Sequence, residues 1–263
     1  MTIPIYQVDA FTENIYAGNP AAICPLQEWI PEEQMQQIAF ENNLSETAFI
    51  VPEGNDYHIR WFTPTTEVAL CGHATLAAAF VFYRHLGFDR EHIRFNSKSG
   101  WLTVISNNTG GFTLDFPADP PAIVSVIPDN FFESLGIEKR TLYKVKFDYM
   151  VELDNQKMVA DLKPDFKKLS QISSRGILVT AKGDDADIVS RCFFPQSGID
   201  EDPVTGSAHC LLVPFWFSKT GKTNFNAIQW SERKGWLECE LKNDRVLMSG
   251  HAVLFLKGEI FLS

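Results

Sequence analysis

The chain has 263 residues, 45% hydrophobic and 21% charged, which is a balance typical of a globular protein. Its net charge of −10 argues against a nucleic-acid partner, because phosphate binding needs clustered Lys and Arg. No apolar run reaches the roughly 20 residues of a membrane helix, and the first residues lack a leader pattern, so we expect a cytoplasmic protein without a membrane partner.

The cysteines and histidines show no spacing typical of metal ligands. The five cysteines are far apart and form no Cys-x-x-Cys pair, and the six histidines form no His-x-x-x-His pair. We therefore expect neither a metal site nor a disulfide framework, and a reducing compartment is the natural location for such a chain.

The first half alternates short strands with two helices. Apolar alternation predicts strands at 3–11, 21–26, 48–52, 57–63, 93–97, 101–106 and 112–116. Helices are predicted at 31–43, where Pro31 precedes two acidic residues, and at 74–87. The proline-rich stretch 117–128 predicts a crossover into the second half, which opens with a short helix at 129–137 and a strand at 143–153.

The second half repeats landmarks of the first in the same order. An Arg-x-Phe-x-Pro unit begins at Arg60 and again at Arg191, and a Gly-Trp-Leu unit begins at Gly100 and again at Gly235. Between these units, the turns Gly72-His73-Ala74 and Gly206-Ser207-Ala208 each lead into an apolar helical stretch. This repetition predicts two domains with the same internal fold, with the ligand site in a cleft between them.

The two Gly-x-Ala turns are candidate anion-binding sites. Each lies where the chain enters a helix, and a helix N-terminus exposes N–H groups and carries partial positive charge. A small residue there lets a carboxylate approach the backbone closely. One such turn alone would more simply allow close packing, but its presence in both halves favours ligand binding.

Four segments together resemble the PhzF-like family of phenazine biosynthesis proteins: QVDAFTENIYAGNPAAI (7–23), NLSETAF (43–49), IRWFTPTTEVALCGHATLAA (59–78) and GIDEDPVTGSAHC (198–210). The resemblance implies an α+β fold similar to diaminopimelate epimerase, with two pseudo-symmetric domains, each a mostly antiparallel sheet wrapped around a central helix. We expect domain bounds of 1–118, completed by a C-terminal strand near 252–263, and 119–251.

The resemblance also implies a function. We expect a cofactor-independent isomerase or epimerase that moves a proton on a small carboxylic acid, and that forms a homodimer. By motif, the acid–base glutamate matches Glu46, and its catalytic partners match His73 and Asp202. The substrate-binding positions match Asn19, Ser45, Gly72, Ala74, Gly206 and Ser207.

The residues themselves support these roles unequally. Residues 172–176, which correspond to the region of Glu46 in the second half, contain no acid. A charged residue that is present in just one of two repeated halves indicates a functional role rather than an architectural one. A glutamate that takes and returns a proton needs a pKa near neutrality, which burial provides. By contrast, Asp202 lies in an acidic run typical of solvated surface, and His73 suits helix capping or packing equally well.

Two other functions stay open. Amino-acid epimerases of this fold use two cysteines, and Cys71 matches the first, but Thr205 stands at the second position, so a Cys71-based racemase lacks its partner thiol. A catalytically silent member that binds a metabolite or protein would not need the set of Glu46, His73 and Asp202. The roles of Cys71 and of Lys234, where many relatives carry glycine, stay undecided.

Overall fold

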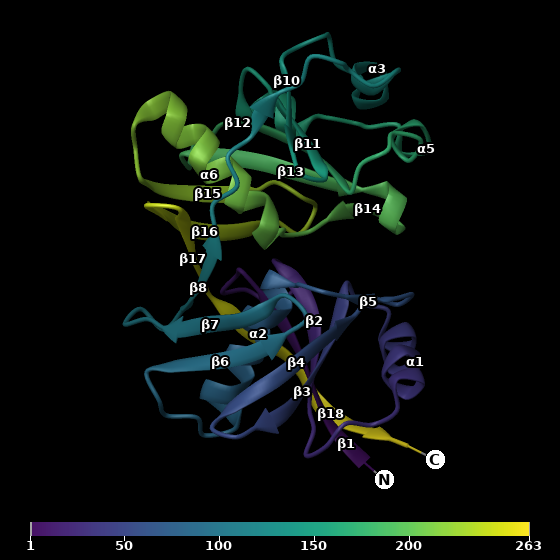
Figure 1. Cartoon of the computed structure of the whole chain (residues 1–263), viewed down its shortest axis with the longest axis vertical. Helices are drawn as coiled ribbons and strands as arrows, with labels where there is room; N and C mark the ends of the chain where they lie inside the picture. Colours follow the sequence, from purple (N-terminus) through teal and green to yellow (C-terminus); the bar gives the residue numbers. More distant parts are fainter. Residues whose placement is uncertain (1, 263) are drawn as a thin grey trace. The chain divides into compact units, whose positions relative to one another are not determined.

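The structure, a computed structural model, describes residues 2–262. Its contacts divide the chain into two compact units: unit 1 holds the residues up to Asp115 and from Met248 onward, and unit 2 is Phe116–Leu247. The chain passes between the units within strands β8 (Phe112–Pro117) and β17 (Arg245–Gly250) (Figure 1). These bounds lie within a few residues of those expected from the sequence.

Unit 1 is a mixed sheet with two helices. Besides parts of β8 and β17, its strands are β1 (Thr2–Ala10), β2 (Asn19–Pro25), β3 (Glu46–Glu53), β4 (Asp56–Phe62), β5 (Glu67–Val68), β6 (His92–Ser97), β7 (Gly100–Ser106) and β18 (Ala252–Phe261). Its helices are α1 (Glu32–Asn42) and α2 (Gly72–His85). Strand β18 pairs antiparallel with β1, so the C-terminal strand extends the sheet of unit 1.

Unit 2 has more and shorter elements. Its strands are β9 (Ala122–Ile123), β10 (Leu142–Val145), β11 (Asp148–Glu152), β12 (Gly176–Lys182), β13 (Ile188–Phe194), β14 (Ile199–Asp202), β15 (Asn224–Gln229) and β16 (Gly235–Lys242). Its helices are α3 (Phe131–Leu135), α4 (Gln156–Ala160), α5 (Phe166–Leu169), the 3-10 turn η1 (Pro195–Ser197) and α6 (Gly206–Thr220).

The strand pairings of unit 1 recur in unit 2. In unit 1, β2 pairs parallel with β3, β3 antiparallel with β4, β4 antiparallel with β5 and parallel with β6, and β6 antiparallel with β7. In unit 2, strands β11, β12, β13, β14, β15 and β16 pair in the same order and directions. Most of these pairs are antiparallel, so the predicted pseudo-symmetric α+β fold is confirmed.

Each unit has one long apolar helix against its sheet. Helix α2 contacts β1, β2 and β3, and helix α6 contacts β16. Both helices are buried over most of their residues, which requires apolar side chains on nearly every face. Both begin earlier than the apolar stretches predict, because the first turn includes the small residues at Gly72 and Gly206.

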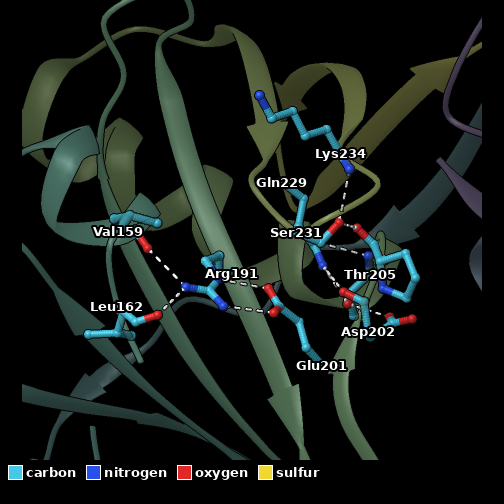
Figure 2. Close-up of polar contacts among 10 residues, drawn as sticks. Val159, Leu162, Arg191, Glu201, Asp202, Thr205, Gln229, Ser231 and Lys234 are labelled. Carbon is cyan, nitrogen blue, oxygen red and sulfur yellow. Dashed lines mark hydrogen bonds and ion pairs between the residues drawn. The ribbon is translucent and has the colours of Figure 1, made fainter. Parts of the chain in front are cut away.

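The repeated arginines of the Arg-x-Phe-x-Pro units are structural. Arg60 on β4 donates two hydrogen bonds to Glu67 on β5, at 2.8 and 2.7 Å. Arg191 on β13 donates two to Glu201 on β14, at 2.7 and 2.8 Å (Figure 2). Such paired bonds fix the geometry of both partners, so each arginine holds the short strand that precedes the long helix of its unit.

The strand predicted at 143–153 is wrong. This segment folds into the antiparallel hairpin of β10 and β11, with Lys146 at the turn at a φ of 27° and Phe147 exposed. The alternation of apolar residues continues across the turn, and the turn contains none of the glycine, proline or asparagine residues that usually mark one. The sequence pattern therefore merged two strands into one.

Among the residues that the structure describes, no helix has the length and apolar character needed to cross a membrane.

Candidate active site

Glu46 lies at the start of β3, at the end of the sheet where α2 begins. The parallel pairing of β2 and β3 places Glu46 beside Ala21, and only 14% of its side chain is exposed. Its Oε2 lies 3.2 Å from Nε2 of His73. The two atoms are within hydrogen-bonding distance, but their alignment is not that of a formed hydrogen bond.

His73, the second residue of α2, is buried and neutral. Burial lowers the pKa of its imidazole to about 3. Its Nδ1 lies 3.2 Å from Nδ2 of Asn19 and 3.5 Å from Sγ of Cys71. An amide NH₂ group only donates, so Nδ1 is the acceptor and Nε2 carries the ring hydrogen.

Cys71 belongs to the same cluster. It is the residue before α2, it is buried, and its thiol is free of any disulfide. Its Sγ, a carboxylate oxygen of Glu46 and a ring nitrogen of His73 all lie within 4.8 Å of one another. We call these three residues the Glu46 cluster.

The other predicted residues of unit 1 surround this cluster. Ser45 directly precedes Glu46 and is partly buried. Gly72 and Ala74 lie in the first turn of α2, on either side of His73, and Ala74 is fully buried. The first N–H groups of a helix have no acceptor within the helix, so this turn presents donors next to the carboxylate of Glu46.

Asp202, the third predicted catalytic residue, is held by an array of hydrogen bonds in unit 2 (Figure 2). Its Oδ2 accepts from the hydroxyl of Thr205 at 2.5 Å. The N–H of Thr205 donates to Oε1 of Gln229 at 2.8 Å, and Nε2 of Gln229 donates to the carbonyl of Asp202 at 2.7 Å. Thr205 and Gln229 are both buried, so this acid is not part of a plain solvated surface.

The acidic run 200–202 therefore divides between two roles. Successive side chains of a strand point to opposite faces. Glu201 pairs with Arg191, whereas Asp202 accepts from Thr205 (Figure 2). Sequence reasoning missed Gln229 as a support for Asp202, and the one signal available was a polar residue at the end of the apolar strand β15.

The second Gly-x-Ala turn, Gly206 and Ser207, begins α6. The hydroxyl of Ser207 accepts a hydrogen bond from Nη2 of Arg175 at 3.3 Å. Arg175 also donates through Nε to the buried Asp148 at 2.9 Å. Ser207 is thus held in place by a charged pair of its own unit.

Lys234 extends away from the array around Asp202 (Figure 2). Its Nζ lies 3.9 Å from the ring centroid of Trp230, a cation–π contact. Its backbone has a φ of 56°, in the left-handed region that glycine adopts most readily. The structure therefore explains why glycine suits this position, and it places the lysine side chain over Trp230.

The family model of the PhzC-PhzF phenazine biosynthesis-like proteins matches residues 8–258. The chain belongs to this family. A Pseudomonas aeruginosa protein named an uncharacterized isomerase is 47% identical over 262 residues, covering 100% of both chains. The crystal structure of a PhzF-family protein from Enterococcus faecalis covers 100% of both chains, with 46% identity and a TM-score of 0.95. The predicted family and the predicted enzyme class, an isomerase, are confirmed.

The predicted relation to the epimerase fold is also confirmed. The structure of a hydroxyproline epimerase from Agrobacterium vitis covers 98% of this chain and 92% of its own, with a TM-score of 0.65. Its identity to this chain is 7%, so the likeness concerns the fold alone.

Proposed function

We propose that this isomerase moves a proton on a small carboxylic acid without a cofactor, and that Glu46 is its acid–base residue. The observation that carries the proposal is the mostly buried carboxylate of Glu46, whose Oε2 lies 3.2 Å from Nε2 of a neutral, buried histidine. A base needs a carboxylate oxygen held close to a fixed neighbour, and the partly buried start of β3 and the buried His73 surround this oxygen.

The proposed reaction has two steps. An oxygen of Glu46 takes a proton from a carbon of the substrate, and the electron pair of the broken C–H bond delocalises toward the neighbouring unsaturated or carboxyl group. The protonated Glu46 then returns the proton to another carbon or to the other face. The substrate carboxylate binds the N–H groups of the first turn of α2, beside Glu46.

A two-thiol racemase is less well supported. Cys71 is the residue before α2, and the residue before α6 is Thr205, whose hydroxyl donates to Asp202. A hydroxyl engaged in this way does not replace a second thiol. Cys71 is therefore assigned no proton-transfer step.

Deuterium exchange tests the proposal. The protein is incubated in D₂O with a panel of small carboxylic and amino acids, and label is measured by mass spectrometry. We expect Glu46→Gln to lower the exchange rate by about 10³-fold, since general acid–base groups contribute about 10²–10⁴. The matched control is Glu53→Gln, an exposed acid at the other end of β3, which should exchange as the wild type does.

Other outcomes would redirect the assignment. Equal labelling by the wild type and Glu46→Gln would contradict the proposal and bring Cys71→Ser forward as the next variant. Absence of label across the panel would favour a silent binding protein. The roles of Asp202, Gly206 and Ser207, the homodimer and the cytoplasmic location stay predictions, and Asp202→Asn in the same exchange assay tests the first of them.

A further inference from the structure

The Glu46 cluster contains three kinds of ligand that zinc prefers. A thiol, an imidazole and a carboxylate, from Cys71, His73 and Glu46, lie within 4.8 Å of one another. The spacing of histidines and cysteines along the sequence predicts no metal site, but the fold brings β3 and the start of α2 together. All three side chains are held in the interior or close to it.

The distances are close to those of a zinc site. Zinc bonds of about 2.0–2.3 Å in a tetrahedral arrangement separate neighbouring ligand atoms by about 3.3–3.7 Å. Oε2 of Glu46 and Nε2 of His73 are already 3.2 Å apart. The three ligand atoms of the cluster lie within 4.8 Å of one another, but Sγ of Cys71 lies 3.5 Å from the other ring nitrogen, Nδ1. The Cys71 side chain must therefore rotate toward Nε2 before one metal ion can reach all three ligands.

Asn19 supplies the outer contact that a zinc-bound histidine needs. When Nε2 of His73 binds a metal, Nδ1 carries the hydrogen and requires an acceptor. The amide of Asn19, 3.2 Å from Nδ1, presents its oxygen to that hydrogen after a rotation of the amide plane. The Asn19 amide can therefore donate to Nδ1 in one tautomer of His73 and accept from Nδ1–H in the other.

The charges of such a site balance. Zinc binds thiolate, so the Cys71 thiol loses its proton to solvent as the Zn–S bond forms. The thiolate and the Glu46 carboxylate together carry two negative charges against the two positive charges of Zn²⁺. A buried site with no net charge avoids the cost of burying a net charge.

We propose that Glu46, Cys71 and His73 form an inhibitory Zn²⁺ site. The metal occupies the carboxylate oxygen that Glu46 uses as a base, so binding and catalysis exclude each other; this inhibition rests on the proposed function, whereas the metal binding does not. Thiolate and imidazole ligands select Zn²⁺, Co²⁺ and Cd²⁺ over Mg²⁺ and Ca²⁺. A fourth position remains for water.

The repeat predicts one metal per chain. The positions of unit 2 that correspond to Glu46, Cys71 and His73 are Gly176, Thr205 and Ser207, none of which offers a thiolate, imidazole or carboxylate. Unit 2 should therefore bind no metal ion, and a measured ratio of one ion per chain agrees with a site in unit 1 alone.

Cobalt titration of the metal-free protein tests the site without any substrate. We expect one Co²⁺ per chain, a sulfur-to-cobalt charge-transfer band in the near ultraviolet, and displacement by Zn²⁺ but not by Mg²⁺. Cys71→Ser should abolish the band, and Cys71→Ser and Glu46→Gln should each weaken Zn²⁺ binding by at least about 100-fold, more than an outer-shell change does. Cys210→Ser, which removes a thiol on α6, should leave the band unchanged.

Two results would overturn the proposal: no charge-transfer band at millimolar Co²⁺ in the wild type, or a band and an affinity that Cys71→Ser leaves intact. Exchange measurements with and without Zn²⁺ separate the two proposals. Zn²⁺ binding at Cys71 with unaffected exchange would reject the inhibition and, with it, Glu46 as the base. Absence of binding alongside loss of exchange in Glu46→Gln would reject the metal site alone.

Discussion

The two units share a scaffold and differ where the chemistry is expected. The same strand order and the same arginine–glutamate pair occur in both. The strand registers place Glu46 beside Ala21 in unit 1, and Gly176 beside Asp148 at the equivalent point of unit 2. The two units therefore share the strands and the arginine–glutamate pair that support the long helix. They differ in the residue at the start of the strand near the N-terminus of that helix.

Unit 2 has no room for a side chain where unit 1 has its glutamate. A Cβ atom added to Gly176 would lie 2.4 Å from Cε1 of Phe194, so that aromatic ring fills the space. The residue that corresponds to Phe194 in unit 1 is Thr63, which is smaller and partly buried. The aromatic ring of unit 2 fills the space that an acidic side chain would need, so unit 2 cannot hold a glutamate at this position. This difference supports a catalytic cluster in unit 1 only.

The arginine pairs should differ in strength, and this is the largest effect on stability that we expect. Arg191 also donates to the carbonyls of Val159 at 3.3 Å and Leu162 at 2.7 Å (Figure 2). Arg191→Met leaves those acceptors and Glu201 without a donor and should lower the free energy of unfolding by about 3 kcal/mol.

The matched change in unit 1 is Arg60→Met. Glu67 keeps a contact with Lys98 after this change, so the expected loss is about 1–2 kcal/mol. Urea unfolding of both variants measures the difference. Equal losses would show that the two backbone carbonyls add nothing to the pair in unit 2.

The position of the Glu46 carboxylate should matter as much as its charge. Glu46→Asp withdraws the carboxylate by one methylene from His73, and a misplacement of about 1 Å costs on the order of 100-fold in rate. Initial rates of deuterium exchange measure this, with Glu53→Asp on the same strand as the control. A Glu46→Asp protein as fast as the wild type would contradict a fixed alignment of Glu46 and His73.

The glycines of the two Gly-Trp-Leu units should resist substitution for different reasons. A Cβ on Gly235 would lie 2.1 Å from Cγ2 of Val204, whereas Gly100 has open space but a φ of 91°. We expect Gly235→Ala to cost about 2 kcal/mol by overpacking and Gly100→Ala about 1 kcal/mol by backbone strain. Thermal unfolding of both variants checks the order, and a larger loss at Gly100 would reverse this interpretation.

The buried histidines should weaken the fold in acid. Burial lowers the pKa of His73 from 6.5 to about 3, so protonation favours the unfolded state. Its contribution is present above pH 6.5 and is lost as the pH falls toward 3. From pH 7.5 to 5.5 the loss is about 1 kcal/mol, so His73→Gln should unfold with a flatter pH dependence.

A second buried histidine serves as a comparison. Burial lowers the pKa of His209 in unit 2 to about 4, so His209→Gln should flatten the acid limb in the same direction. An unchanged pH dependence in His73→Gln would contradict a neutral, buried His73.

Much of the fold follows from local pattern, and the errors have physical causes. The helix at 31–43 was predicted from Pro31 and the acids that follow it, and α1 covers Glu32–Asn42. The hairpin at 142–152 was missed because its turn residues lack a conformational signature. Gln229 was missed because a buried amide is revealed only by the backbone groups around it.

The sequence by itself determined the duplicated architecture, the family and the presence of Glu46 in one half only, because repeats and motifs are properties of residue order. Only the tertiary structure decided that Glu46, Cys71 and His73 form one cluster and that His73 is neutral. Those facts depend on the parallel pairing of β2 with β3 and on the burial of the start of α2. Such contacts join segments far apart in the chain, and burial rather than residue type sets the pKa of a histidine.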